Sequence, residues 1–210
     1  YYVIENAEIT LECNPEDLNK KKLLGLQNIG INRLSIGVQS FNNKFLKFMN
    51  RSHTSYKSIK VIKTAQEIGL KNISIDLIYG LPNQTIKDWK KNLTIMINLN
   101  IPHFSAYELT VESKTPLQNL IKTKKVIPLK EKIVIAQFNT LVNMAKKNDF
   151  IHYEISNFSK KRFFSKHNTG YWNNDNYIGI GPSAHSYNGK SRRWNVSSNK
   201  IYVEKIMTNK

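Results

Sequence analysis

Four polar side chains stand where predicted buried strands end, and an arginine follows the second strand. They are Glu12, Gln39, Asp76 and Thr110, with Arg51 in the loop region. In parallel βα folds, ligands bind at the carboxyl ends of the strands, where side chains leave the packed core. This set is rich in hydrogen-bond acceptors and has one guanidinium. It suits a small molecule that carries hydroxyls, an amine and a carboxylate.

Three of these side chains each suit one part of such a ligand. Asp76 can accept hydrogen bonds from a ribose diol, Gln39 can both donate and accept, and Arg51 can clamp a carboxylate. Strand ends are polar in any parallel barrel, however, so their position alone also allows a purely structural explanation.

The elements that must position these side chains are four predicted buried strands. Each segment is short, rich in β-branched or aromatic residues and close to turn signals. They cover residues 9–13, 33–39, 73–78 and 103–110.

Amphipathic helical patterns separate the strands. The first helix is predicted to begin at Asn14, whose side chain can cap it, and to end at Gly30. Thr54 precedes the second helix, Thr85 is expected to cap the third, and the fourth follows Pro128.

This alternation predicts an α/β fold of right-handed parallel units covered by helices. Because no glycine-rich phosphate turn follows any strand, a partial TIM-like (β/α) barrel is favoured over a doubly wound sheet. Beyond residue 150 the chain becomes loop-rich, with one further strand predicted at 177–180. We divide the chain into a partial barrel, residues 1–125, and residues 126–210, which hold the last barrel helix and an α+β extension.

The net charge of +17 raises nucleic-acid binding as an alternative. The excess is nearly all lysine, whereas phosphate and base recognition favours the planar fork of arginine. Arginines occur only at positions 33, 51, 162, 192 and 193. A basic nucleic-acid-binding domain is therefore the less favoured alternative, and no specific nucleic acid is expected as a partner.

Cys13 is the only cysteine of the chain. It cannot form an intrachain disulfide or, by itself, a cysteine-ligated zinc or iron–sulfur site, and it indicates a reducing compartment, the cytoplasm. A lone cysteine beside a strand is typical of a small buried hydrophobe. No apolar run reaches the roughly 20 residues that span a bilayer.

Three motifs resemble one known family. They are ITLECNP at residues 9–15, NRLSIGVQSF at residues 32–41 and IDLIYGLPNQ at residues 75–84. In this order they resemble the radical S-adenosylmethionine (SAM) family of oxygen-independent coproporphyrinogen III oxidases and the related HemW-type heme chaperones.

This resemblance implies which residues bind the cofactor. Glu12, Gln39, Arg51 and Asp76 match positions that contact SAM in the family. Thr110 matches a position whose contact runs through the backbone. The family's 4Fe–4S cluster loop, Cys-x-x-x-Cys-x-x-Cys, is absent, so we expect the cluster ligands to lie upstream of residue 1. The chain resembles a form that is incomplete at both ends, and we assign no catalytic residue to it.

The segment HNTGYW at residues 167–172 resembles the His-Asn-x-x-Tyr-Trp motif of the heme chaperones. This implies heme binding near His167, with Tyr171 and Trp172 beside the macrocycle and His185 as the alternative ligand. A structural corner, with the histidine hydrogen-bonded and the aromatic rings in the core, is the competing explanation. The remaining histidines are interpreted as surface or structural residues: His53, His103 and His152.

The resemblance leaves two functions in different classes. A HemW-type chaperone binds heme, SAM and a 4Fe–4S cluster and passes heme to an acceptor protein, with a membrane-associated acceptor left open. An oxygen-independent coproporphyrinogen III oxidase decarboxylates a porphyrin precursor in heme biosynthesis. The oligomeric state is not predicted.

Overall fold

The structure is a computed structural model that describes residues 3–208. The chain forms two compact units, Tyr1–Phe163 and Phe164–Lys210. The predicted division after residue 125 separates the partial barrel from the extension, whereas these two units are distinguished by compactness. The predicted division stays a proposal.

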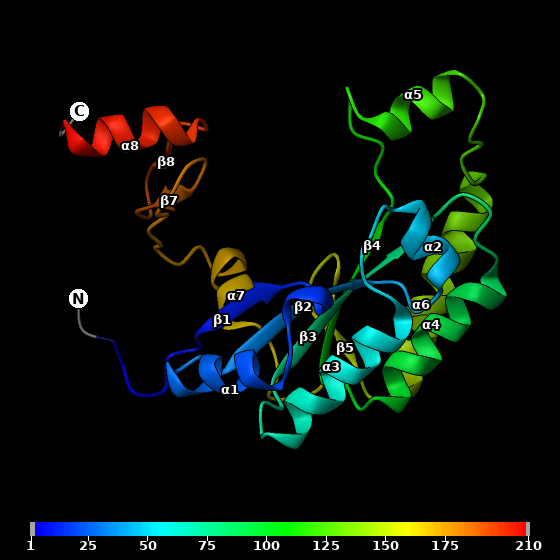
Figure 1. The fold of residues 1–210 in the computed structure, drawn as a ribbon, viewed down its shortest axis with the longest axis horizontal. Coiled ribbons are helices and arrows are strands. Elements are labelled where there is room, and N and C mark those ends of the chain that lie inside the picture. Colours follow the sequence, from blue (N-terminus) through cyan, green and yellow to red (C-terminus); the bar gives the residue numbers. More distant parts are fainter. Residues whose placement is uncertain (1–2, 209–210) are drawn as a thin grey trace. The chain divides into compact units, whose positions relative to one another are not determined.

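The first unit is built on a six-stranded sheet in the order β1-β2-β3-β4-β6-β5 (Figure 1). The first four strands pair in parallel, whereas β6 runs antiparallel to β4 and to β5. Their bounds are Thr10–Cys13, Arg33–Gln39, Ile73–Tyr79, His103–Glu108, Ile151–His152 and Asn157–Ser159 for β1 to β6. This sheet, with its helices, is the predicted partial TIM-like barrel.

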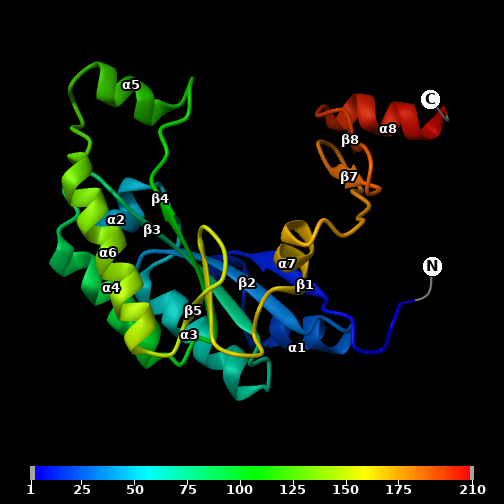
Figure 2. The same cartoon turned by 180° about the vertical axis from the view of Figure 1, so that it is seen from behind.

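The helices α1, α3, α4 and α6 pack along the sheet, whereas α5 stands away from it (Figures 1 and 2). The bounds of the helical elements in this unit are Pro15–Asp17 for the 3-10 turn η1, Lys20–Asn28 for α1, Asn43–Phe48 for α2, Ser55–Glu67 for α3, Ile86–Asn98 for α4, Pro116–Lys122 for α5 and Glu131–Lys147 for α6. The strand β2 shows why the sheet has two different faces. Leu34, Ile36 and Val38 are fully buried in the core, and they alternate along the strand with Ser35 and Gly37. Since side chains alternate across a strand, the second set points to the opposite face.

The predicted start of the first helix at Asn14 is wrong. Asn14 makes no capping bond, and Pro15–Asp17 forms a separate 3-10 turn. The helix α1 begins later, where the Asn19 side chain accepts a hydrogen bond from the Lys22 amide. The residue before a proline is driven towards extended backbone, and Asn14 has φ −106° and ψ 151°. The Asn14 side chain instead donates to Asp17 and accepts from Arg51.

The predicted cap of α4 is confirmed as a reciprocal capping box. The Asp88 amide donates to Thr85 Oγ1 over 3.1 Å, and the Thr85 amide donates to Asp88 Oδ2 over 3.0 Å. We expect Thr85→Ala to lower the free energy of unfolding by about 1 kcal/mol, because one amide loses its partner. Urea denaturation measures this change.

The matched control is Thr94→Ala, since the hydroxyl of this exposed threonine bonds only the Lys90 carbonyl within the same helix. Alanine is a good helix former there, so stability should stay equal or rise slightly. Equal losses in both variants would show that the cap contributes nothing specific.

The loop after β3 is locked to α6 by a buried glutamine. Gln137 Oε1 accepts from the Gly80 amide over 2.8 Å, and its Nε2 donates to the Gln84 carbonyl over 3.0 Å. Trp89 Nε1 donates to the Gln137 carbonyl over 3.1 Å. Gly80 has φ +77°, which glycine adopts without strain. These contacts fix the loop at the carboxyl end of β3.

The second unit holds two helices and a hairpin. The helix α7 covers Lys166–Trp172 and α8 covers Asn199–Met207, while β7 and β8 cover His185–Tyr187 and Arg192–Trp194. The strand predicted at 177–180 is wrong, because only a single bridge between Tyr177 and Tyr187 forms there. The backbone groups of Gly179 are bonded by side chains and not by a neighbouring strand. Ser186 accepts from the Gly179 amide, and Asn195 donates to the Gly179 carbonyl.

None of the helices within residues 3–208 has the length and apolar character that a membrane span requires.

Candidate functional site

Three of the predicted strand-end residues line one pocket of about 300 Å³ in the first unit. Glu12, Gln39 and Asp76 come from the neighbouring strands β1, β2 and β3. The other residues of its lining are Cys13, Asn14, Ser35 and Gly37. The order of the parallel strands thus brings together side chains that lie far apart in the sequence.

Gly37 allows two amide side chains to approach the strand. A Cβ at this position would stand 3.0 Å from Gln39 Nε2 and 3.2 Å from Asn14 Oδ1. Both distances are closer than ordinary van der Waals contact. A residue larger than glycine would therefore push Gln39 or Asn14 out of its present place in the pocket.

Gln39 occupies the centre of a tight three-residue turn. Its φ is +63°, and the Ser40 amide donates to the Val38 carbonyl over 2.7 Å. A turn closed between residues i and i+2 with positive φ is the rarer and more strained form of the γ-turn. The buried Gln39 side chain is held in the pocket by this local geometry.

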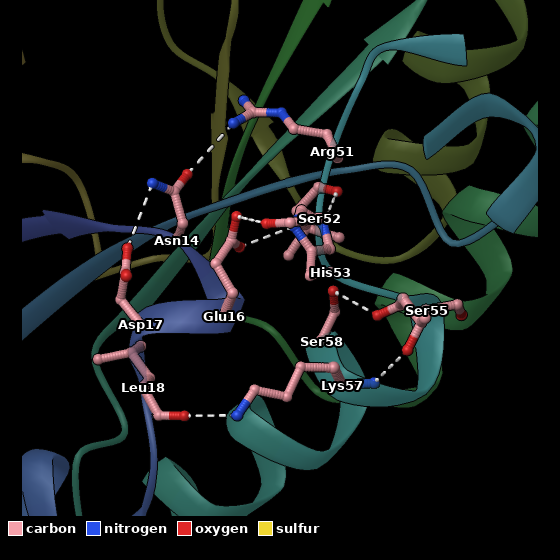
Figure 3. Close-up of polar contacts among 12 residues, drawn as sticks. Asn14, Glu16, Asp17, Leu18, Arg51, Ser52, His53, Ser55, Lys57 and Ser58 are labelled. Atoms are coloured by element: carbon pink, nitrogen blue, oxygen red, sulfur yellow. Dashed lines mark hydrogen bonds and ion pairs between the residues drawn. The ribbon is translucent and has the colours of Figure 1, made fainter. Parts of the chain in front are cut away.

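Arg51 stands next to the pocket and contacts one of its lining residues. Its Nη1 donates to Asn14 Oδ1 over 3.3 Å (Figure 3). Thr110 is placed differently from the other predicted site residues. It is exposed beyond the end of β4, it does not line the pocket, and its hydroxyl bonds the Glu108 carbonyl over 3.5 Å.

Burial raises the pKa of Asp76 to about 6, well above its usual value near 4. A hydrogen bond from Ser105 lowers this pKa, the Glu12 carboxylate raises it, and the guanidinium groups of Arg33 and Arg51 lower it. Asp76 is therefore ionised at neutral pH but close to its titration range. A strongly perturbed carboxyl in a pocket marks a candidate site.

The second unit contains a smaller pocket, of about 180 Å³, beside the predicted heme-binding motif. His167 and Tyr171, which are four residues apart on α7, both line it. Their rings meet edge to face with centroids 4.7 Å apart, and Tyr171 meets Tyr177 at the same distance. His167 is exposed, so its ring can be reached from solvent. Helical i,i+4 spacing accounts for the pairing.

Trp172 and His185 do not join this pocket. Trp172 is 57% exposed, and His185 lies on β7, opposite Trp194 in the hairpin register. The His185 and Trp194 rings are tilted, with centroids 6.0 Å apart. Of the four predicted heme-binding residues, the structure thus brings together His167 and Tyr171.

Residues 2–94 match the radical SAM superfamily. The chain carries a radical SAM domain. Its curated relatives include the heme chaperone HemW of Bacillus subtilis, 37% identical over 95% of this chain and 53% of the relative. HemW of Lactococcus lactis is 35% identical over 97% of this chain and 54% of the relative. The resemblance to the HemW-type branch is confirmed, and the chain spans about half the length of these curated relatives.

Solved structures share the fold of this radical SAM domain. The coproporphyrinogen III oxidase HemN from Escherichia coli, a radical SAM enzyme, aligns with a TM-score of 0.80 and 22% identity. The alignment covers 97% of this chain and 49% of that chain. At this identity the likeness shows the fold alone.

The pocket of the radical SAM domain has the charge that SAM requires. SAM carries a sulfonium and an ammonium against one carboxylate, so its net charge is positive. Glu12 and Asp76 make the pocket acidic although the chain as a whole carries +17. The donor and acceptor set therefore fits this cofactor.

The residues of this chain do not fit a 4Fe–4S cluster, which is held by several thiolates. Cys13 is the only cysteine, and burial raises the pKa of its thiol to about 12. Its Sγ lies 3.5 Å from the Ser35 carbonyl, and its side chain packs against the core. Cys13 is a packed thiol, and its carboxylate neighbours Asp17, Asp76 and Glu12 raise the pKa further.

The three histidines interpreted as surface or structural residues are each buried with hydrogen-bond partners or exposed on the surface. His103 is buried between Ser74 Oγ and Tyr153 Oη, each 2.7 Å from a ring nitrogen, and burial lowers its pKa to about 3. His152 is exposed and stacks on Phe158. His53 is buried and bonded through both ring nitrogens.

Four residues of the pocket lining were missed by sequence reasoning, namely Cys13, Asn14, Ser35 and Gly37. A signal for two of them was present. Ser35 and Gly37 alternate with apolar residues along β2, in phase with Gln39, so a period of two places all three on one face. Asn14 was interpreted as a helix cap, whereas its side chain makes no cap bond, accepts from Arg51 and lines the pocket.

Proposed function

We propose that this chain is the SAM-binding portion of a HemW-type heme chaperone, with heme as its cargo. The observation that carries the proposal is the exposed His167 ring set against Tyr171, in a chain whose relatives are named heme chaperones. An imidazole can ligate heme iron, and aromatic rings can flank the flat macrocycle. An exposed ligand also suits a cargo that must leave again.

Within the proposal, the acidic pocket holds SAM. Ionised Asp76 accepts hydrogen bonds from the ribose hydroxyls, Gln39 donates and accepts, and Arg51 binds the carboxylate. Glu12 adds negative charge, and Thr110 contributes through its backbone. The pocket's lining and the match of residues 2–94 to the superfamily support these roles.

The partners follow from the chemistry of the cargo. The proposed acceptors of heme are apoproteins, including membrane-associated ones, and the proposed location is the cytoplasm. A 4Fe–4S cluster would take its thiolates from outside these 210 residues, because this chain has one cysteine.

A second candidate function is oxygen-independent coproporphyrinogen III oxidase. The fold likeness to the Escherichia coli oxidase supports it. The relatives named HemW, at 35–37% identity against 22% for the oxidase, favour the chaperone.

Binding of S-adenosylhomocysteine tests the SAM part of the proposal. We expect the full-length protein to bind this analogue, and Gln39→Asn to raise the dissociation constant about tenfold, because the shorter amide is withdrawn from the pocket. Asparagine tolerates positive φ, so the turn itself should survive. Isothermal titration calorimetry measures both constants.

Gln66→Asn is the matched control, since Gln66 bonds the Leu99 carbonyl away from the pocket. Its dissociation constant should equal that of the wild type. Failure of the wild-type protein to bind the analogue would refute the SAM site.

A further inference from the structure

The loop that follows β1 is fastened to the segment that follows α2 by side-chain contacts (Figure 3). Ser52 Oγ donates to Glu16 Oε1 over 2.6 Å, and Lys57 Nζ donates to the Leu18 carbonyl over 2.7 Å. Arg51 reaches Asn14 in the same segment. Glu16 and Leu18, two and four residues after Asn14, are thus bonded to Ser52 and to Lys57 in α3.

His53 lies at the centre of these contacts, with a fully buried side chain. Its Nδ1 stands 2.9 Å from Glu16 Oε2, and its Nε2 stands 3.1 Å from the Val38 carbonyl. A carbonyl oxygen can only accept, so Nε2 must donate. Partial burial raises the pKa of Glu16, but the hydrogen bond from Ser52 and the charge of His53 outweigh it and hold this pKa below its usual range. The ring thus lies between two oxygen atoms, the Val38 carbonyl at Nε2 and the Glu16 carboxylate at Nδ1.

The Val38 carbonyl is the group that closes the strained turn at Gln39. It accepts from the Ser40 amide over 2.7 Å and from His53 Nε2 over 3.1 Å. The other end of the imidazole holds Glu16, two residues after Asn14. One buried ring thus links the two backbone segments that carry Asn14 and Gln39, which meet above Gly37 in the pocket.

We propose that His53 is a positioning residue of the SAM pocket, holding the Gln39 turn and the Asn14 loop in register through its two hydrogen bonds. This inference rests on the proposed function of the pocket. His53 itself does not line the pocket, so it acts through Val38 and Glu16 and not by contact with the ligand. The strained turn supplies the reason, since a γ-turn with positive φ at its central residue is rare and costs free energy that surrounding contacts must offset.

The two hydrogen bonds can be separated by amide substitutions. Glutamine places its amide nitrogen near the position of Nε2, so His53→Gln keeps a donor for the Val38 carbonyl. Asparagine places its amide nitrogen near Nδ1, so His53→Asn keeps a donor for Glu16 but not for Val38. If the turn at Gln39 matters for binding, the two variants must differ.

The test measures the dissociation constant of S-adenosylhomocysteine for the full-length protein by calorimetry, with thermal unfolding recorded in parallel. We expect His53→Ala to weaken binding about tenfold, His53→Asn to weaken it nearly as much, and His53→Gln to stay within about threefold of wild type. His152→Ala, which removes an exposed ring on β5, is the control and should bind like the wild type.

A purely structural role would lower the unfolding temperature of the His53 variants and leave the dissociation constant of the folded protein unchanged. If Gln39→Asn weakens binding at the same time, that result would overturn the positioning role of His53 and leave the proposed SAM site standing. Absence of binding in the wild type would overturn the proposed function and this inference with it. If His53→Ala does not fold, equal dissociation constants for the glutamine and asparagine variants would likewise overturn it.

Discussion

Asp76→Asn is expected to stabilise the fold at pH 7 by about 2 kcal/mol and, at the same pH, to weaken binding of S-adenosylhomocysteine. Burial raises the pKa of Asp76 from 3.8 to about 6. Each pKa unit corresponds to about 1.4 kcal/mol between the two protonation states of the carboxyl group. Contact of this side chain with solvent makes the effect on stability smaller than the full pKa difference would give. Ionised Asp76 therefore destabilises the folded state at neutral pH.

The sign of this effect fixes its pH dependence. Because the folded pKa lies above the unfolded one, the folded state holds the proton more tightly. The contribution of Asp76 to the free energy of unfolding is fully present below about pH 4 and is lost as the pH rises through about 6. Urea denaturation should show the variant and wild type nearly equal at pH 3.5 and separated at pH 7. Glu112→Gln, at an exposed loop position, should show no such separation.

Binding should follow the opposite course. An ionised carboxylate accepts from both ribose hydroxyls, whereas an amide offers one acceptor and a donor group that faces them. We expect about tenfold weaker binding in the variant at pH 7, and a wild-type affinity that rises between pH 5 and pH 7. Equal affinity of both proteins at pH 7 would remove Asp76 as a ligand residue.

The parallel part of the sheet could be predicted because its signals are local. The strand Arg33–Gln39 and the start of Ile73–Tyr79 are set by dense β-branched and apolar residues, and the cap at Thr85 by a motif of four residues. The predicted strand 103–110 is too long by two residues, since β4 ends at Glu108 and Thr110 is exposed. Strand ends depend on how long the neighbouring strand continues, which periodicity does not record.

The short elements could not be predicted for a different reason. The helix α2 has six residues and α5 has seven, too few to establish a helical period. The strands β5 and β6 have two and three residues and exist because β4 offers a free edge to β6. These elements are fixed by contacts between distant parts of the chain.

The candidate site could likewise be predicted only in part. The identity and strand of Glu12, Gln39 and Asp76 could be predicted from position, but the backbone conformation that presents Gln39 could not. A positive φ is expected at glycine or asparagine, and here it falls on glutamine because His53 and the Ser40 amide hold the turn. The contact between His53 and the Val38 carbonyl joins residues fifteen positions apart, which local patterns do not record.

His167→Ala is expected to abolish most of the Soret shift that hemin shows on binding to the wild-type protein, and to weaken hemin binding at least tenfold. Three side chains in the lining of this pocket are of types that ligate heme iron, the His167 imidazole and the phenols of Tyr171 and Tyr177. Because His167 is exposed, its loss should lower stability by less than about 1 kcal/mol. A spectroscopic change can then be assigned to ligation and not to unfolding.

The neighbouring rings and the second histidine provide the controls for hemin binding. His185→Ala removes the imidazole that faces Trp194 on the hairpin. The Soret maximum of bound hemin should stay at its wild-type wavelength in this variant. Tyr171→Phe keeps the ring that meets His167 edge to face and removes the hydroxyl, so binding should be retained if Tyr171 acts by packing. A Soret shift that survives His167→Ala and disappears in His185→Ala would transfer the ligand role to His185. Because the two imidazoles sit on different elements, α7 and β7, a single pair of spectra decides between them.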